Sequence, residues 1–139
     1  MRKDEIEDTP YSECTLTKLE IFQLYARAWL PVFTSKPNPF WKKHIFDFFA
    51  GRGQDCDGTP GSPLRLLTEV KGRSGEICNK GLKVTVTVCD DKPEKIETLT
   101  DLVRRTGLAP SWMNFDPQAG DFSENLARYL PILRSSDTA

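Results

Sequence analysis

An α/β fold with a parallel sheet is the fold class that the sequence predicts, and two observations carry this prediction. Residues 82–88 (Leu-Lys-Val-Thr-Val-Thr-Val) alternate apolar and polar side chains and are rich in β-branched residues, which is the pattern of a strand. A helical pattern also precedes the first strand pattern, and each strand pattern is then followed by a helical one. Strands joined by helices form parallel sheets with right-handed crossovers, so a sheet of about three strands is expected.

The first helix is expected to begin at Thr17, because Thr17 and Glu20 match a capping box, in which each side chain binds a backbone N–H group. Pro31 and the proline-containing stretch 35–39 are expected to end it. Apolar side chains recur with helical spacing between these limits and form one stripe, which we expect to pack into the core. The stripe consists of Ile21, Leu24, Tyr25, Ala28, Trp29 and Val32.

The first unit of the sheet follows this helix. Residues 44–50 are short, apolar and aromatic, and they are predicted to form a buried strand that stops at residues 51–53, Gly-Arg-Gly. Residues 54–61 have the composition of a loop, with turn signals at Asp-Gly and Pro-Gly. Ser62 then offers an N-cap, and Pro63 a first helical residue, for the next helix.

Two further units are expected along the rest of the chain. A loop over residues 72–81 leads to the strand at 82–88, and a helix then begins at Pro93 and is closed by Gly107. A short third strand is expected over residues 112–115. It is followed by a turn over residues 116–120 and by a last helix over residues 123–130, which Pro131 stops.

The whole chain is expected to be one domain, residues 17–133, between a polar segment at 1–16 and a tail at 134–139. Its 19 Lys and Arg residues against 20 Asp and Glu residues leave a net charge of −1, so charge does not support a nucleic-acid partner, although one is possible. No apolar run reaches the ~20 residues of a membrane span, and the acidic start lacks the apolar segment of a signal peptide. We therefore expect a cytoplasmic protein.

The cysteines and the histidine do not predict a metal site. Cys14, Cys56, Cys78 and Cys89 never stand at the C-x-x-C spacing that presents two thiolates to zinc. The single histidine, His44, also leaves a Ser-His-Asp triad without support. We expect scattered, reduced cysteines and no metal.

Acidic residues and glycines stand where the predicted strands end. Asp47 precedes the Gly51-Arg52-Gly53 loop, Asp90 and Asp91 follow the second strand, and Asp121 and Phe122 follow the third. Ligands of open parallel sheets bind outside the carboxyl ends of the strands, so these loops are expected to form one crevice. Glycines permit close backbone approach, and an acid at the end of the second strand can accept hydrogen bonds from a ribose diol.

A dinucleotide-binding fold fits this pattern less well. Its fingerprint needs a third glycine or alanine, where this chain has Cys56, and a helix N-terminus directly behind the loop for the pyrophosphate. Here the polar residues 54–61 separate Gly53 from Ser62. A ligand with ribose and base but without phosphate is therefore favoured, and S-adenosylmethionine is the common one.

Three segments resemble the N-terminal half of the three-Cys-motif partner family. Residues 47–53 read Asp-Phe-Phe-Ala-Gly-Arg-Gly, residues 57–58 Asp-Gly and residues 61–64 Gly-Ser-Pro-Leu, and all three stand in the family's order. The sequence at 120–122, Gly-Asp-Phe, resembles the exit of the family's third strand. The resemblance spans residues 17–133 and implies part of a class I, Rossmann-like methyltransferase of bacteria or phages that uses S-adenosylmethionine.

This resemblance has two departures. Arg52 replaces the proline that the family usually has between the two glycines. The family also continues into a fourth strand whose Asp-Pro segment lies near the transferred methyl group, and the present sequence ends at Ala139 before such a strand. Asp116-Pro117 stands ahead of the third strand-end acid, which is the wrong place for that segment. We therefore expect a truncated methyltransferase, a cofactor-binding fragment or one piece of a split assembly, with its catalytic residues unknown.

The resemblance implies roles for the strand-end residues. Gly51 and Gly53 would approach the amino-acid portion of S-adenosylmethionine, Asp47 its ammonium group, Asp90 or Asp91 the ribose hydroxyls, and Asp121 with Phe122 the adenine. A protein carrying the three-Cys motif is an implied partner. The alternative function is a non-catalytic protein-interaction module with the same fold. The expected cofactor-binding set is Asp47, Phe49, Ala50, Gly51, Gly53, Asp90, Asp91, Asp121 and Phe122.

Overall fold

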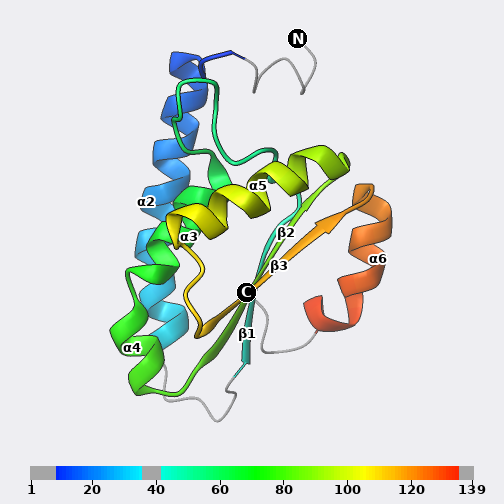
Figure 1. Cartoon of the computed structure of the whole chain (residues 1–139). Helices are drawn as coiled ribbons and strands as arrows, with labels where there is room; N and C mark the ends of the chain where they lie inside the picture. Colours follow the sequence, from blue (N-terminus) through cyan, green and yellow to red (C-terminus); the bar gives the residue numbers. More distant parts are fainter. Residues whose placement is uncertain (1–8, 36–41, 135–139) are drawn as a thin grey trace.

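A three-stranded parallel sheet with helices between its strands forms the centre of the molecule (Figure 1). The computed structural model describes residues 9–35 and 42–134. Strand order is β1-β2-β3, and a long helix precedes the first strand, so the predicted partial Rossmann-like α/β fold is confirmed. The helices and strands are α2 (Glu13–Ser35), β1 (Lys42–Asp47), α3 (Ser62–Lys71), α4 (Ser74–Asn79), β2 (Lys83–Asp90), α5 (Pro93–Thr106), β3 (Met113–Ala119) and α6 (Phe122–Leu133).

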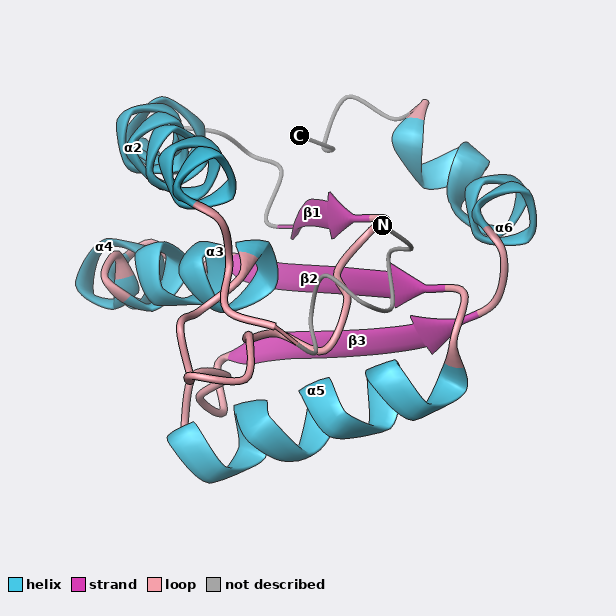
Figure 2. Ribbon diagram, turned by 90° about the horizontal axis from the view of Figure 1, so that it is seen from above, coloured by secondary structure: helices cyan, strands magenta, loops and turns pink. Residues whose placement is uncertain are grey.

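The main core lies between one face of the sheet and the helices α3 and α5. Val84, Val86 and Val88 project from the central strand β2 on this face and are at most 2% exposed. Leu67 of α3 and Leu99 of α5 are fully buried in the same cluster. The helices α2, α3 and α4 lie on one side of the sheet and α6 lies on the other (Figure 2).

Helix α2 begins earlier than predicted. Its first turn is capped by Ser12, whose Oγ accepts a hydrogen bond from the N–H of Thr15 at 3.1 Å. The hydroxyl of Thr17 instead donates to the carbonyl of Glu13 inside the helix, so the predicted capping box at Thr17 and Glu20 is wrong. Pro31 does not end α2 either, because the helix continues to Ser35. The rest of the proline-containing stretch lies outside the described residues.

The apolar stripe of α2 was predicted to pack into the core, and for most of its residues this prediction is wrong. Ile21, Leu24, Tyr25 and Val32 are between 57% and 68% exposed. The packed residues include Ala26 and Leu30, which are buried, and Phe22, which is partly buried. Within the predicted stripe, Trp29 does pack against the core and is partly buried.

Polar contacts with α3 orient α2. Glu69 of α3 accepts hydrogen bonds from Gln23 at 3.0 Å and from the Arg27 guanidinium at 2.8 Å. The bonds from Arg27 and Gln23 lower the pKa of Glu69, outweighing its partial burial. Because the small side chain of Ala26 lies on the same face, the two helices can pack closely there.

The first strand and the helix after it also differ from their predicted boundaries. Strand β1 ends at Asp47 rather than at Ala50, because the carboxylate of Asp47 accepts the N–H of Phe49 at 3.1 Å and turns the chain. Gly61, not Ser62, is the N-cap of α3. The hydroxyl of Ser62 instead donates to Asp47 at 2.7 Å and ties the helix to the end of β1.

Three later predictions are corrected as well. Residues 74–79, in the expected loop at 72–81, form the short helix α4. Strand β3 continues to Ala119 through the expected turn, since β3 is an edge strand and an edge tolerates Pro117. Helix α6 continues past Pro131 to Leu133. The helix from Pro93 closed by Gly107 is confirmed, with Gly107 in the left-handed conformation at φ 68°.

A hydrogen-bonded acid holds α6 against the second face of the sheet. The Oδ2 atom of Asp116 accepts from the hydroxyl of Tyr129 at 2.7 Å and from that of Thr87 at 2.9 Å. Its Oδ1 atom accepts from the amide of Gln118 at 2.7 Å. The amide oxygen of Gln118 in turn accepts from Arg128 of α6 at 2.8 Å.

This network shifts two pKa values in opposite directions. Burial raises the pKa of Asp116, but the hydrogen bonds from Gln118, Tyr129 and Thr87 outweigh burial and lower it overall. Burial and the neighbouring Asp116 raise the pKa of Tyr129 to about 12. Asp116 therefore stabilises the fold above its unfolded pKa and loses this effect as the pH falls. Tyr129 stabilises the fold below pH ~10 and loses its effect as the pH rises towards 12.

The substitution Tyr129→Phe is expected to lower the free energy of unfolding by about 1.5–3 kcal/mol at neutral pH, because it removes a hydrogen bond to a charged group. The difference from the parent should shrink as the pH rises from 10 towards 12, where the parent tyrosine itself ionises in the folded state. Urea denaturation at a series of pH values measures both. Tyr25→Phe, at an exposed position, is the control, and an equal loss in it would contradict the assignment.

Candidate functional site

The loops that follow the three strands meet at Asp90, the last residue of β2. Its Oδ2 atom accepts the N–H of Gly51 at 2.9 Å and its Oδ1 atom accepts the N–H of Lys92 at 3.2 Å. Its backbone carbonyl accepts the N–H of Gly120 at 3.1 Å. One residue, only 1% exposed, thus joins the loops after β1, β2 and β3 at the carboxyl edge of the sheet.

The loop after β1 depends on two glycines with positive φ. Gly51 has φ 68° and Gly53 has φ 97°, a region that residues with a Cβ rarely adopt. A Cβ on Gly53 would lie 2.6 Å from the Cδ1 atom of Leu99, so this glycine also lets the loop approach α5. The N–H of Ala50 donates to the carbonyl of Cys89 at 2.9 Å and continues the contact with β2 beyond the strand.

The polar insert at 54–61 is an ordered loop built around a buried acid. The carboxylate of Asp55 accepts the N–H groups of Tyr11 at 2.8 Å, of Asp57 at 3.0 Å and of Thr59 at 2.9 Å. Burial raises the pKa of Asp55, but these bonds lower it overall. The insert thereby separates the glycine loop from the start of α3, as the sequence indicates.

The four predicted acids at the strand ends have different surroundings. Asp47 accepts from Phe49 and Ser62, and Asp121 caps α6 by accepting the N–H of Glu124 at 2.8 Å. Asp90 is buried, as described above. The carboxylate of Asp91 is exposed and has no hydrogen-bond partner within the part of the chain that the structure describes. Of the four, Asp91 is therefore the acid most open to a ligand.

Two exposed aromatic rings stand beside this edge. Phe49, from the loop after β1, is 62% exposed, and Phe122, at the start of α6, is 43% exposed. Their rings stack with centroids 5.3 Å apart and planes 22° apart. Phe48 meets Phe122 edge-on at 5.5 Å, a contact that sequence reasoning missed although Phe48 stands within the motif.

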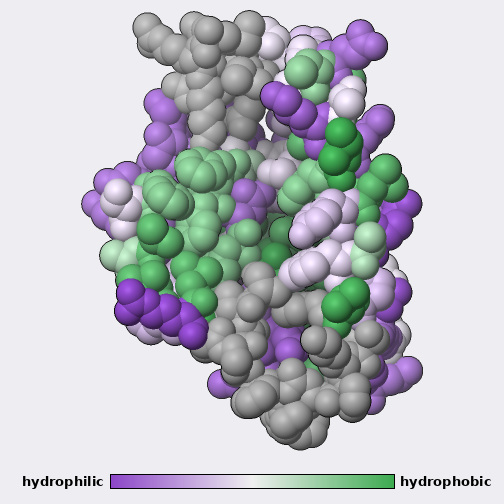
Figure 3. Space-filling view, turned by 180° about the vertical axis from the view of Figure 1, so that it is seen from behind, coloured by the Kyte–Doolittle hydropathy of each residue, from purple (hydrophilic) through white to green (hydrophobic). Residues whose placement is uncertain are grey.

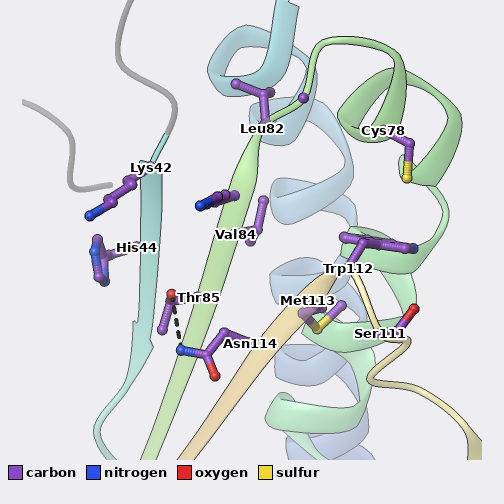
Figure 4. Close-up of a pocket in the computed structure, with 12 residues that line it drawn as sticks. Lys42, His44, Cys78, Leu82, Val84, Thr85, Ser111, Trp112, Met113 and Asn114 are labelled. Atoms are coloured by element: carbon purple, nitrogen blue, oxygen red, sulfur yellow. Dashed lines mark hydrogen bonds between the residues drawn. The ribbon is translucent and has the colours of Figure 1, made fainter.

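A hollow lies at the other edge of the sheet, and sequence reasoning did not identify it. It has a volume of about 810 Å³ and is lined from the amino ends of the three strands, by His44, Lys83 and Asn114 among others (Figure 4). The signal was present in β2, where Lys83 and Thr85 alternate with buried valines. Such alternation indicates that the second face of a sheet meets solvent.

The cysteines lie apart from one another. All four are free thiols, with Cys14, Cys56 and Cys78 exposed and Cys89 buried. Burial raises the pKa of the Cys89 thiol to about 11, with a further effect of Asp116, which leaves it protonated and unreactive at neutral pH. In residues 9–35 and 42–134, no group of three or more His, Cys, Asp or Glu side chains could hold a metal ion.

The substitution Asp90→Ala is expected to lower the free energy of unfolding by about 2–4 kcal/mol, because two N–H groups lose a buried charged acceptor. Hydrogen exchange should accelerate at the amides of Gly51 and Lys92, whose acceptor is removed. Asp91→Ala, at the exposed neighbour, should change stability by less than about 0.5 kcal/mol. Equal effects of the two substitutions in urea denaturation would show that Asp90 does not join the loops.

No family model matches the sequence, and no curated protein matches it. Over the described ranges, none of the helices combines the length and the apolar character needed to cross a membrane.

Proposed function

We propose that the loops at the carboxyl edge of the sheet form a crevice that binds S-adenosylmethionine, as the cofactor-binding portion of a methyltransferase-like protein. The observation that supports this proposal most is the junction at Asp90, which gathers a glycine loop, an exposed acid and two exposed aromatic rings at one edge. This edge is where open parallel sheets bind nucleoside ligands. A carboxylate can bind the ribose hydroxyls, an aromatic face can stack on adenine, and a glycine loop lets the amino-acid portion approach the backbone.

Asp91 is the residue proposed to bind the ribose hydroxyls. Its carboxylate is exposed, whereas both carboxylate oxygens of Asp90 already accept backbone N–H groups in a closed environment. A carboxylate that accepts from both hydroxyls of a diol gains two charge-assisted hydrogen bonds. Asp90 then acts by holding the loop, and Asp91 by contacting the ligand.

Adenine is proposed to stack on Phe122, with Phe49 beside it. Both rings are exposed and already stacked, so a planar base can cover apolar surface that water now contacts. Asp121 is held as the N-cap of α6 and is available to the exocyclic amine of the base from an exposed position.

The amino-acid portion is proposed to lie over the glycine loop. Gly51 and Gly53 carry no side chain, so a ligand can reach the backbone there, and Asp47 offers negative charge to an ammonium group. The Asp47 carboxylate accepts from the N–H of Phe49 and from the hydroxyl of Ser62, and a carboxylate can accept several hydrogen bonds. The ordered insert at 54–61 makes a pyrophosphate on the start of α3 a poorer alternative.

The competing function is a protein-interaction module, and one observation favours it. The exposed apolar stripe of α2, with Ile21, Leu24, Tyr25 and Val32, is larger than single scattered apolar residues would be. A chain that binds no S-adenosylmethionine would support this alternative.

Asp91→Ala is expected to weaken binding of S-adenosylmethionine by about 1.5–3 kcal/mol, which is roughly a tenfold to hundredfold loss, because it removes a charged acceptor. Titration calorimetry on the full chain measures it. Asp57→Ala, at an exposed position in the insert, is the matched control and should bind like the parent. Absence of binding by the parent would overturn the proposal, and equal binding by Asp91→Ala would remove the ribose assignment.

We also predict that the 139-residue chain transfers no methyl group. All the side chains proposed for the crevice contact the cofactor, and His44 lies near the amino end of β1, away from it. A transferase needs further groups that act on the acceptor in the transition state. Incubation with labelled S-adenosylmethionine and pooled tRNA, DNA and protein tests this. Acceptor-dependent transfer of label would contradict it.

A further inference from the structure

The second face of the sheet divides into two unlike halves. Residues that pair across neighbouring strands form rows over the sheet. Lys42 of β1 pairs with Lys83 of β2 in one row. In the next row, His44 of β1 pairs with Thr85 of β2, which pairs with Asn114 of β3. Side chains alternate along a strand, so these rows lie on the face opposite the buried valines of β2. Helix α6 packs on the carboxyl half of this face through Tyr129, which contacts Asp116 and Phe46.

The amino half of this face is hollowed. The hollow of about 810 Å³ is lined by both rows, and its wall continues across the starts of β2 and β3 (Figure 4). Its size exceeds what an inorganic anion fills and matches that of small-molecule sites, which span ~300–1,000 Å³. Figure 3 views the molecule from behind and shows hydrophobic side chains next to hydrophilic ones on this side of the molecule.

The charge of the hollow has one sign. Lys42, Lys83 and His44 contribute basic groups, and no Asp or Glu is among the described residues that line it. This local excess contrasts with the chain as a whole, whose net charge is −1. Two exposed lysines that line one hollow, with no acid among its described lining residues, favour the binding of an anion.

The other side chains suit a planar, hydrogen-bonding group. Trp112 lines the hollow from the start of β3, on the side of Cys78, and packs in part against the buried core (Figure 4). The amide of Asn114 donates to the hydroxyl of Thr85 at 3.4 Å, and both residues keep further donors and acceptors towards the hollow (Figure 4). An amide that can donate and accept together is suited to the edge of a nucleobase.

We propose that this hollow is a second ligand site, which binds a nucleoside phosphate through Lys42 and Lys83, with the base against Asn114 and Thr85. The phosphate group can belong to a free nucleotide or to a nucleotide within a single strand. The site lies at the amino edge of the sheet, and the crevice proposed for S-adenosylmethionine lies at the carboxyl edge. The two ligands therefore bind together without competing.

The test is titration of the full chain with uridine, uridine 5′-monophosphate and an eight-residue oligouridylate. The monophosphate is expected to bind at least tenfold more tightly than uridine, since the lysines act on the phosphate. The double variant Lys42→Ala/Lys83→Ala should lose at least tenfold in this affinity. Lys18→Ala/Arg104→Ala removes two exposed cations elsewhere and should bind like the parent.

A further arm identifies the source of the phosphate. Binding of the octamer much more tightly than the monophosphate, with an affinity that falls steeply with salt, would assign the site to a single strand. Equal affinities would assign it to a free nucleotide. Asn114→Leu should reduce the preference for the monophosphate over ribose 5-phosphate.

Three results would overturn the proposal. They are no binding of any phosphate probe at millimolar concentration, unchanged affinity in the double lysine variant, and displacement of the monophosphate by S-adenosylmethionine. Circular dichroism of each variant confirms that it is folded. Failure of S-adenosylmethionine to bind the parent leaves this test unaffected, because the nucleotide probes are titrated alone.

Discussion

The buried carboxylate of Asp90 is the interaction on which the proposed crevice depends. A charge in this position is costly to bury unless it is hydrogen-bonded, and here backbone N–H groups of Gly51 and Lys92 satisfy it. Asp90 ends the central strand, where it pairs with Ala119 of β3. Its carbonyl binds the loop after β3 as well, so the three loops share one support.

The two faces of the sheet differ because successive side chains of β2 point to opposite faces and also differ in polarity. Its valines form a dry core with α3 and α5, while Thr87 and Cys89 face the side where α6 packs. On that side, Asp116 accepts from Tyr129 and Thr87, and the Tyr129 ring also meets Phe46 edge-on at 5.2 Å. The same sheet thus carries an apolar interface on one face and a mixed aromatic and hydrogen-bonded interface on the other.

The fold class could be predicted from the sequence, because the spacing of apolar residues and the positions of Gly and Pro distinguish strands from helices. The convergence of the loops also followed, because parallel strands end at one edge. The packed face of α2 could not be predicted, since periodicity reveals a stripe but not whether a partner covers it. The decisive contact there, Arg27 with Glu69, joins positions 42 residues apart.

Local signals were misread where a side chain had a distant partner. Ser62 matched an N-cap, but its hydroxyl binds Asp47 instead. Asp116-Pro117 matched a turn, but a strand and a helix engage Asp116 from both sides. Asp90 and Asp91 are adjacent in sequence and alike in chemistry, and only the packing around them separates a buried support from an exposed carboxylate.

Pro117 gives the sheet two unequal edges. A strand that pairs alongside an edge needs backbone donors and acceptors in alternation, and a proline has no N–H to supply. The outer edge of β3 carries this interruption, whereas β1 contains no proline from Lys42 to Asp47. An additional strand would therefore pair more readily beside β1 than beside β3, because the edge of β3 lacks the backbone N–H group of Pro117.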